Sequence, residues 1–245
     1  MQYRFRKPEL IPTLVTIIVV TLMFSLGAWQ LKRLAWKNAL ITTIEKAQAE
    51  APQDLLSIPE SEIHHAEWHN IRVKGHFLHA KELYATPRYL HEQMGYAVLT
   101  PLEIKTPSGK QYVIINRGWV APEKKDILTR KNGNPIKDVT IEGVIREAQP
   151  QGQFRPDNRP DKNLWFWYDI PAMAKYTELP LMPIMIDATR ITLKDGTVLK
   201  EGPTTFPIEI SIRNDHLGYA ITWFLIGIAG LVMYCIYYLE RKPAK

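Results

Sequence analysis

Two charge-free stretches decide how this chain folds: LIPTLVTIIVVTLMFSLGAWQL, residues 10–31, and LGYAITWFLIGIAGLVMYCIYYL, residues 217–239. As α-helices they would be about 33 to 35 Å long, which is enough to cross a hydrocarbon core of about 30 Å. We therefore predict a transmembrane helix in each stretch. A cleaved signal peptide is an alternative for the first, because Ser25-Leu26-Gly27 loosely resembles a cleavage site.

The rest of the chain has the composition of a water-facing domain. The 245 residues are 46% hydrophobic and 23% charged, but outside the two stretches the apolar share falls to about 39%. We therefore predict one domain over residues 32–216. These values exclude a disordered chain and a polytopic carrier. The single cysteine, Cys235, excludes a disulfide scaffold and a redox pair within the chain.

The positive charge gathers beside the two stretches, on the sides of the termini. The basic residues there are Arg4, Arg6, Lys7, Arg241, Lys242 and Lys245. The positive-inside rule therefore predicts that both tails, residues 1–9 and 240–245, are cytoplasmic and that the domain lies across the membrane. Little room precedes the first stretch for an organellar transit peptide, so we expect a bacterial plasma membrane and a periplasmic domain. The remaining charge of the domain is too small to indicate nucleic-acid binding.

The domain pattern predicts mostly antiparallel β-structure in a small barrel or sandwich. Residues 32–50 contain no glycine or proline and are expected to extend the first helix, with a proline-punctuated linker at 51–60. Two hairpins are predicted, at turns 106–109 and 194–196. The expected strands are 67–77, 96–104, 111–119, 139–146, 184–193, 197–199 and 206–212. Short helices are expected at 122–130 and at 170–176, the latter with Asp169 as N-cap.

Enzyme signatures are absent: the sequence has no GxSxG, GxxxxGK[ST], GxGxxG or HExxH motif. His64, His65 and His69 form the one cluster with metal-ligand potential. Their segment reads as a loop entering a strand, where this spacing does not bring two rings to one metal. We therefore favour solvent-exposed histidines and keep a metal site as the alternative.

His216 stands at the mouth of the second stretch and is the strongest candidate for chemistry. The residues that share its helical face, or lie at the same end of the first helix, are Tyr219, Ala220, Trp223, Trp29, Arg33 and Trp36. One interpretation is an aromatic belt at the membrane interface. The other is a site for a flat amphipathic ligand, since imidazole ligates haem iron and arginine pairs with propionates.

Five motifs follow one another along nearly the whole chain: GAWQLKR at 27–33, VKGHF at 73–77, NRGWV at 116–120, NLWF at 163–166 and NDHLGYAITWF at 214–224. In this combination they resemble the Surfeit locus protein 1 family, whose members assist assembly of haem-copper cytochrome c oxidase. The resemblance implies a membrane-anchored assembly factor rather than an enzyme. Its expected partners are the catalytic subunit of the oxidase, haem A synthase and membrane lipid.

The resemblance also implies site residues, with haem a as a transiently bound cofactor. It implies that His216 is the iron ligand and Trp223 a pocket residue. The helical face and helix-end positions described above add Tyr219 to the packing surface and Trp29 with Arg33 as support. Two alternatives remain: a scaffold that holds the oxidase subunit without touching haem, and a periplasmic metalloenzyme built on the histidine cluster.

The NRGWV motif has a less obvious role, and we expect it to be structural. Arg117 is expected to form an ion pair, Gly118 to allow a particular backbone conformation, and Trp119 to pack in the core.

Overall fold

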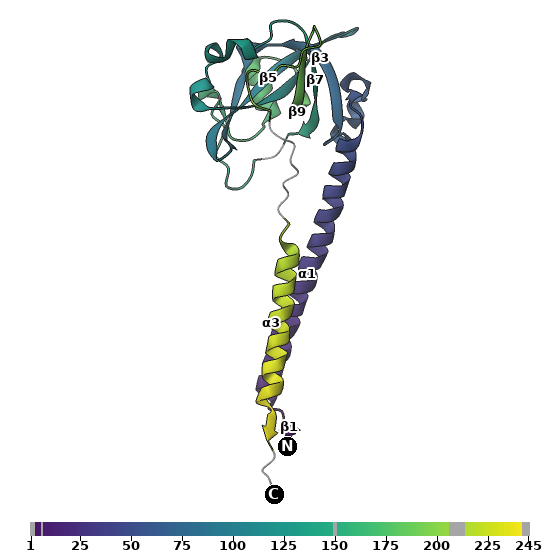
Figure 1. The fold of residues 1–245 in the computed structure, drawn as a ribbon, viewed down its shortest axis with the longest axis vertical. Helices are drawn as coiled ribbons and strands as arrows, with labels where there is room; N and C mark the ends of the chain where they lie inside the picture. The colour runs from purple at the N-terminus through teal and green to yellow at the C-terminus, as the bar shows by residue number, and fades with distance from the viewer. Residues whose placement is uncertain (1–2, 6, 149–150, 206–213, 242–245) are drawn as a thin grey trace. The chain divides into compact units, whose positions relative to one another are not determined.

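The computed structural model describes residues 3–5, 7–148, 151–205 and 214–241. The chain divides into two compact units (Figure 1). The helical unit comprises residues 1–43 and 210–245, and the sheet unit comprises residues 44–209.

The helical unit consists of two long apolar helices. α1 runs over Leu10–Ala49 and α3 over His216–Tyr237, so the predicted extension of the first helix to about residue 50 is confirmed. Both are long and apolar enough to cross a membrane, and few of their apolar residues are buried. Beyond them, the short strands β1 (Tyr3–Phe5) and β10 (Leu239–Arg241) pair antiparallel.

Small residues bring α1 and α3 side by side (Figure 1). A Cβ placed on Gly27 would lie 2.7 Å from the ring of Phe224, and one on Gly227 would lie 2.6 Å from the ring of Phe24. These two rings also meet edge to face, with centroids 5.4 Å apart. Helices in membranes associate through such close packing at small residues, because burial of apolar surface gives no advantage there.

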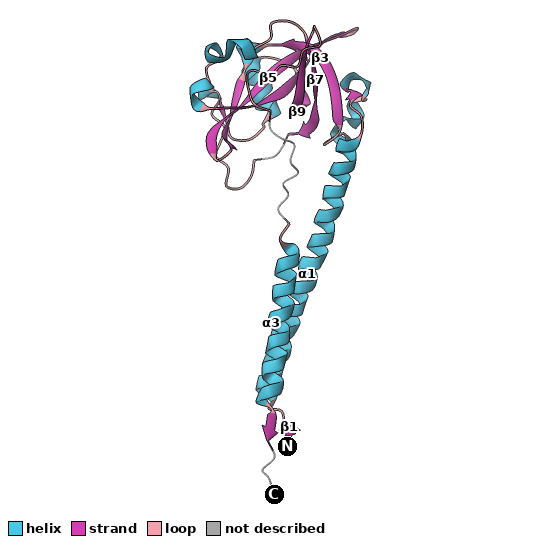
Figure 2. Cartoon of the chain, viewed as in Figure 1, coloured by secondary structure: helices cyan, strands magenta, loops and turns pink. Residues whose placement is uncertain are grey.

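Figure 2 shows the strands of the sheet unit in magenta. Eight strands form one mixed sheet, with order β2-β3-β7-β9-β6-β5-β4-β8. Their bounds are β2 Gln53–Asp54, β3 Asn70–Phe77, β4 Leu83–Leu90, β5 Gln93–Thr106, β6 Gly109–Val120, β7 Val139–Glu147, β8 Leu164–Trp165 and β9 Leu181–Leu193. The end of β3 also pairs with β5, so the pairings β3-β7-β9-β6-β5-β3 form a closed cycle.

Most pairings are antiparallel, but β2–β3, β4–β8 and β6–β9 are parallel. The sequence did not predict these three, because parallel partners are joined by long connections and not by a recognisable turn. Both predicted hairpins are confirmed. The first joins β5 and β6, and in the second the Leu193 amide donates to the Thr197 carbonyl at 2.8 Å.

The helices of the sheet unit are short (Figure 2). α2 spans Ile170–Thr177, and Asp169 caps it by accepting from the Ala172 amide at 3.1 Å, as predicted. The helix predicted at 122–130 is instead two 3₁₀ helices, η4 and η5. The 3₁₀ helices are η1 Leu55–Ser57, η2 Glu60–His65, η3 His79–Lys81, η4 Pro122–Lys124, η5 Ile127–Gly133 and η6 Pro160–Lys162.

The segment predicted as a linker, 51–60, contains β2 and η1. Its Leu55 is only 1% exposed and belongs to the same core cluster as Ile71. The sequence missed β4, whose pattern is interrupted by Pro87. The strand expected at 206–212 lies outside the described residues.

Candidate functional site

His216 opens α3 and contacts a residue that the sequence reasoning did not single out. Its Nδ1 lies 2.6 Å from Oε1 of Gln30 on α1. Both side chains are half-buried. Gln30 could have been found, since an amide inside a charge-free stretch needs a hydrogen-bond partner when water is excluded.

Other polar pairs join α1 to α3 or to the residue Asn214 shortly before it. On the His216 side, Asn214 Nδ2 donates to Asn38 Oδ1 at 2.8 Å. At the opposite end, the hydroxyls of Thr13 and Tyr234 lie 2.7 Å apart. The helices are therefore held by apolar packing along their middle and by hydrogen bonds near their ends.

The predicted stripe on α3 divides between buried and exposed positions. Ala220 is buried and Trp223 is half-buried, whereas Tyr219 is 54% exposed. On α1, Trp29 is 56% exposed. His216 thus contacts Gln30, which follows Trp29 in the sequence. Among the described residues, Tyr219 and Trp29 are each more than half exposed at this end of the helical unit.

Arg33 makes a local contact of its own. Its guanidinium carbon lies 4.0 Å from the ring centre of Trp36, one turn along α1. Both side chains are exposed. This stacking places the arginine charge on the outer surface of α1 and does not join it to His216.

The residues around His216 fit a haem-type ligand. Nδ1 is engaged with Gln30, while Nε2 makes no hydrogen bond to the residues that the structure describes. A half-buried imidazole with one available nitrogen, near exposed aromatic faces, is a suitable axial ligand for haem iron.

A second polar group lies deep in the sheet unit and includes the NRGWV motif. Glu82 is shared by two arginines: Arg117 Nη1 lies 3.0 Å from its Oε1, and Arg130 Nη2 lies 2.5 Å from its Oε2. The Thr100 hydroxyl donates to the same Oε1 at 3.3 Å. Arg117 also donates to Asn134 Oδ1 at 3.1 Å. We call Glu82, Arg117, Arg130, Thr100 and Asn134 the buried ion cluster.

Burial and charge compete in this cluster. Burial alone would raise the pKa of Glu82, but hydrogen bonds from His79 and Arg130 and the charges of both arginines lower it to about 2. Burial lowers the pKa of Arg117 to about 10, against the opposing effect of Glu82. Glu82 and Arg117 therefore stay charged near neutral pH. The contacts of Glu82 with Arg117 and Arg130 fix the three side chains in place.

The expected ion pair of Arg117 is thus confirmed, with Glu82 as its partner. Gly118 has a φ of +116°, and a Cβ there would overlap the carbonyl of Thr204. Trp119 is half-buried and lies outside the two clusters of core residues. Its Nε1 donates to the Arg88 carbonyl at 3.2 Å, and its ring covers Gly95.

The histidine cluster is dispersed among different partners. Nδ1 of His64 lies 3.4 Å from a carboxylate oxygen of Glu147, and Nδ1 of His69 lies 3.4 Å from the carbonyl of Glu67. Among the described residues, no three histidine, cysteine or acidic side chains are placed to hold a metal ion.

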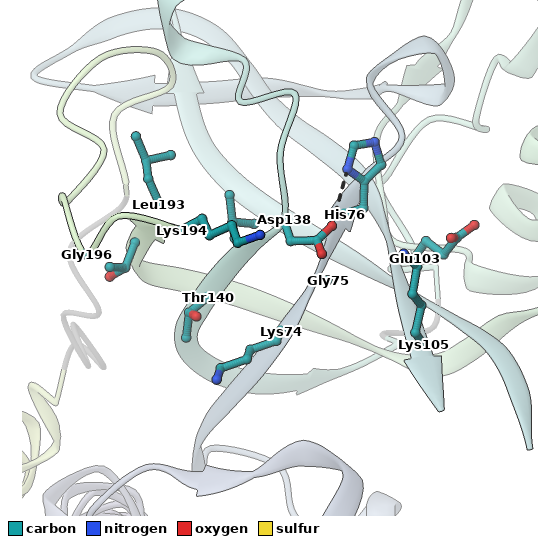
Figure 3. Close-up of a pocket in the computed structure, with 12 residues that line it drawn as sticks. Lys74, Gly75, His76, Glu103, Lys105, Asp138, Thr140, Leu193, Lys194 and Gly196 are labelled. Atoms are coloured by element: carbon teal, nitrogen blue, oxygen red, sulfur yellow. Dashed lines mark ion pairs between the residues drawn. The ribbon is translucent and has the colours of Figure 1, made fainter. Parts of the chain in front are cut away.

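A pocket of about 500 Å³ opens on the sheet unit among residues of β3, β5, β7 and β9 (Figure 3). In this view His76 points toward Asp138, and the two form an ion pair at 3.7 Å. Glu103 pairs with Lys110 at 2.9 Å, and this hydrogen bond lowers the pKa of the carboxyl. Because both carboxylates already have basic partners, we do not place the functional site here.

Comparisons with known proteins agree with the motif order. A family model described as "SURF1 family" matches residues 17–228. The chain is 32% identical to a SURF1-like protein of Monosiga brevicollis over 94% of its length and 87% of that protein. It is 31% identical to Surfeit locus protein 1 of Xenopus tropicalis, over 92% and 75% of the two chains. For the Homo sapiens protein of that name the identity is 30%, over 94% and 78%.

Proposed function

The chain belongs to the SURF1 family, and on that basis we propose that it is a membrane-anchored assembly factor for haem-copper cytochrome c oxidase and not an enzyme. The family match over residues 17–228 carries this proposal. It is supported by two helices that are long and apolar enough to cross a membrane, one on each side of the sheet unit in the sequence.

We further propose that the chain binds haem a transiently and passes it to the catalytic subunit of the oxidase. When bound, the haem would supply an iron centre that an imidazole nitrogen can ligate. His216 offers that imidazole, and Trp223 and Tyr219 offer aromatic surface for the macrocycle. Trp29 extends that surface from α1, while Arg33 provides a positive charge for a propionate.

The distribution of charge supports the proposed membrane placement. Basic residues on the terminal sides of both apolar stretches favour cytoplasmic tails, so the sheet unit would lie across the membrane. A bacterial plasma membrane with a periplasmic domain stays a prediction, since the relatives named above are eukaryotic. Haem A synthase is the further partner that handover of haem a calls for.

The test is the haem content of the protein purified from cells that make haem A. We expect an absorbance spectrum of bound haem in the wild type and its loss in His216→Ala. His65→Ala is the matched control, because it removes an exposed imidazole from the sheet unit. Haem loading that is equal in wild type and His216→Ala would refute the ligand assignment.

A scaffold without haem contact is the competing proposal. It predicts that the oxidase catalytic subunit co-purifies with this chain even from cells that lack haem A. Haem-dependent co-purification, lost in His216→Ala, would instead support handover.

A further inference from the structure

We propose that Gln30 is the positioning residue of the haem site: it holds the proton of His216 on Nδ1 and so keeps Nε2 available as the ligand atom. This inference rests on the proposed function. The observation behind it is the 2.6 Å contact between His216 Nδ1 and Gln30 Oε1, which joins α3 to α1.

The chemistry of the two side chains sets the direction of the hydrogen bond. The Oε1 atom of a glutamine only accepts, so Nδ1 of His216 must donate. A neutral imidazole has one proton, which this contact places on Nδ1. Nε2 then carries a lone pair, which is the form that binds a metal.

Without Gln30, the proton of His216 would no longer be held on Nδ1. An imidazole in water favours its proton on Nε2, where the proton blocks metal ligation. Partners of this kind fix the tautomer of ligating histidines in known metal sites, and their loss typically weakens metal binding by 10- to 100-fold.

The place of Gln30 in the chain strengthens the argument. It lies in the last turn of the charge-free stretch 10–31, where an unpaired amide would be costly in an apolar environment. Its side chain is half-buried, and its Oε1 atom contacts His216. The same contact also fixes the orientation of the imidazole ring, since Nδ1 is tied to α1.

The first test reads the tautomer without any haem. The full chain is labelled with ¹⁵N-histidine in detergent, and the imidazole signals of His216 are identified by their loss in His216→Ala. We expect a protonated Nδ1 and an unprotonated Nε2 in the wild type. Gln30→Glu keeps an acceptor oxygen and should keep this pattern, whereas Gln30→Leu should move the proton to Nε2. An unchanged pattern in Gln30→Leu would overturn the proposal.

The second test measures affinity by titrating the same proteins with iron protoporphyrin IX. We expect at least tenfold weaker binding in Gln30→Leu, recovery in Gln30→Glu, and an altered reduction potential in both. Asn38→Leu is the matched control, because it removes the hydrogen bond between Asn38 of α1 and Asn214, two residues before α3, and leaves His216 intact.

The outcomes separate the two proposals. Equal binding by wild type and His216→Ala would refute the haem site, while the tautomer measured by ¹⁵N would stand. Loss of binding in His216→Ala, with Gln30→Leu equal to wild type, would refute the role of Gln30 alone. A loss in Asn38→Leu as large as that in Gln30→Leu would also refute it, since the effect would then come from helix packing.

Discussion

The buried ion cluster of the sheet unit and the His216–Gln30 pair of the helical unit differ in how many of their polar atoms have partners. In the cluster, both oxygens of Glu82 are occupied by arginines, and Thr100 adds a further hydrogen bond. In the pair, one nitrogen of His216 is held and the other has no partner among the described residues.

This difference indicates that the cluster stabilises the fold and that the pair can bind a ligand. A buried charge whose partners are all internal holds strands and loops together and has little left to offer a ligand. A half-buried imidazole with one nitrogen open contributes little to stability but can ligate an incoming metal. Changes in the cluster should therefore affect folding, and changes in the pair should affect binding.

The largest effect is expected from Glu82→Ala. It leaves two guanidinium groups buried without their carboxylate, which should lower the free energy of unfolding by about 3–5 kcal/mol. Chemical denaturation of the detergent-solubilised chain measures this. Glu142→Ala is the control, because its pair with Arg72 is partly exposed and should contribute at most about 1 kcal/mol. Equal losses in the two variants would mean that the cluster is not a special determinant of the fold.

Acid should weaken the same cluster. The pKa of Glu82 is about 2 in the folded chain, against an ordinary value of 4.5, which applies to the unfolded chain. Its stabilising contribution is therefore complete above pH 4.5 and is lost as the pH falls toward 2. This loss amounts to about 3 kcal/mol. Unfolding measured from pH 7 to 3 should show a steeper decline for the wild type than for Glu82→Gln. Parallel curves would contradict the assignment.

A smaller loss, about 1–3 kcal/mol, is expected from Gly118→Ala. The substitution adds a Cβ that overlaps the Thr204 carbonyl at a residue with φ of +116°. Gly196→Ala is the matched control: its φ is also positive, at +87°, but nothing lies within 4 Å of the added Cβ. The difference between their unfolding free energies isolates the contact with Thr204. If the two variants lose the same stability, backbone strain alone accounts for the glycine.

Much of this contrast was predictable from the sequence, because it depends on local patterns. The length of the two charge-free stretches predicted both long helices, and the turn residues predicted both hairpins. Asp169, as a predicted N-cap, indicated where α2 begins. The Arg117 ion pair was expected too, as part of the structural role assigned to the NRGWV motif.

The partners of Arg117 and His216 could not be predicted from the sequence, because they are distant in the chain. Glu82 and Arg130 meet Arg117 only after β4, β6 and η5 are assembled, and β6 joins β9 in parallel without a shared turn. Gln30 and His216 are separated by 186 positions. Packing of α1 on α3 brings them together, and no local spacing rule reports that contact.

The smallest effect on stability, and the sharpest test of the contrast, is expected from His216→Ala. It removes one hydrogen bond between half-buried side chains, so the unfolding free energy should fall by only about 0.5–1.5 kcal/mol. Haem loading should nevertheless be lost, whereas Gly118→Ala should retain it in the fraction that stays folded. Denaturation and absorbance spectra of both variants, measured on the same preparations, decide the matter. A His216→Ala protein as unstable as Glu82→Ala would place the histidine among the structural residues, because an open ligand nitrogen by itself contributes nothing to folding.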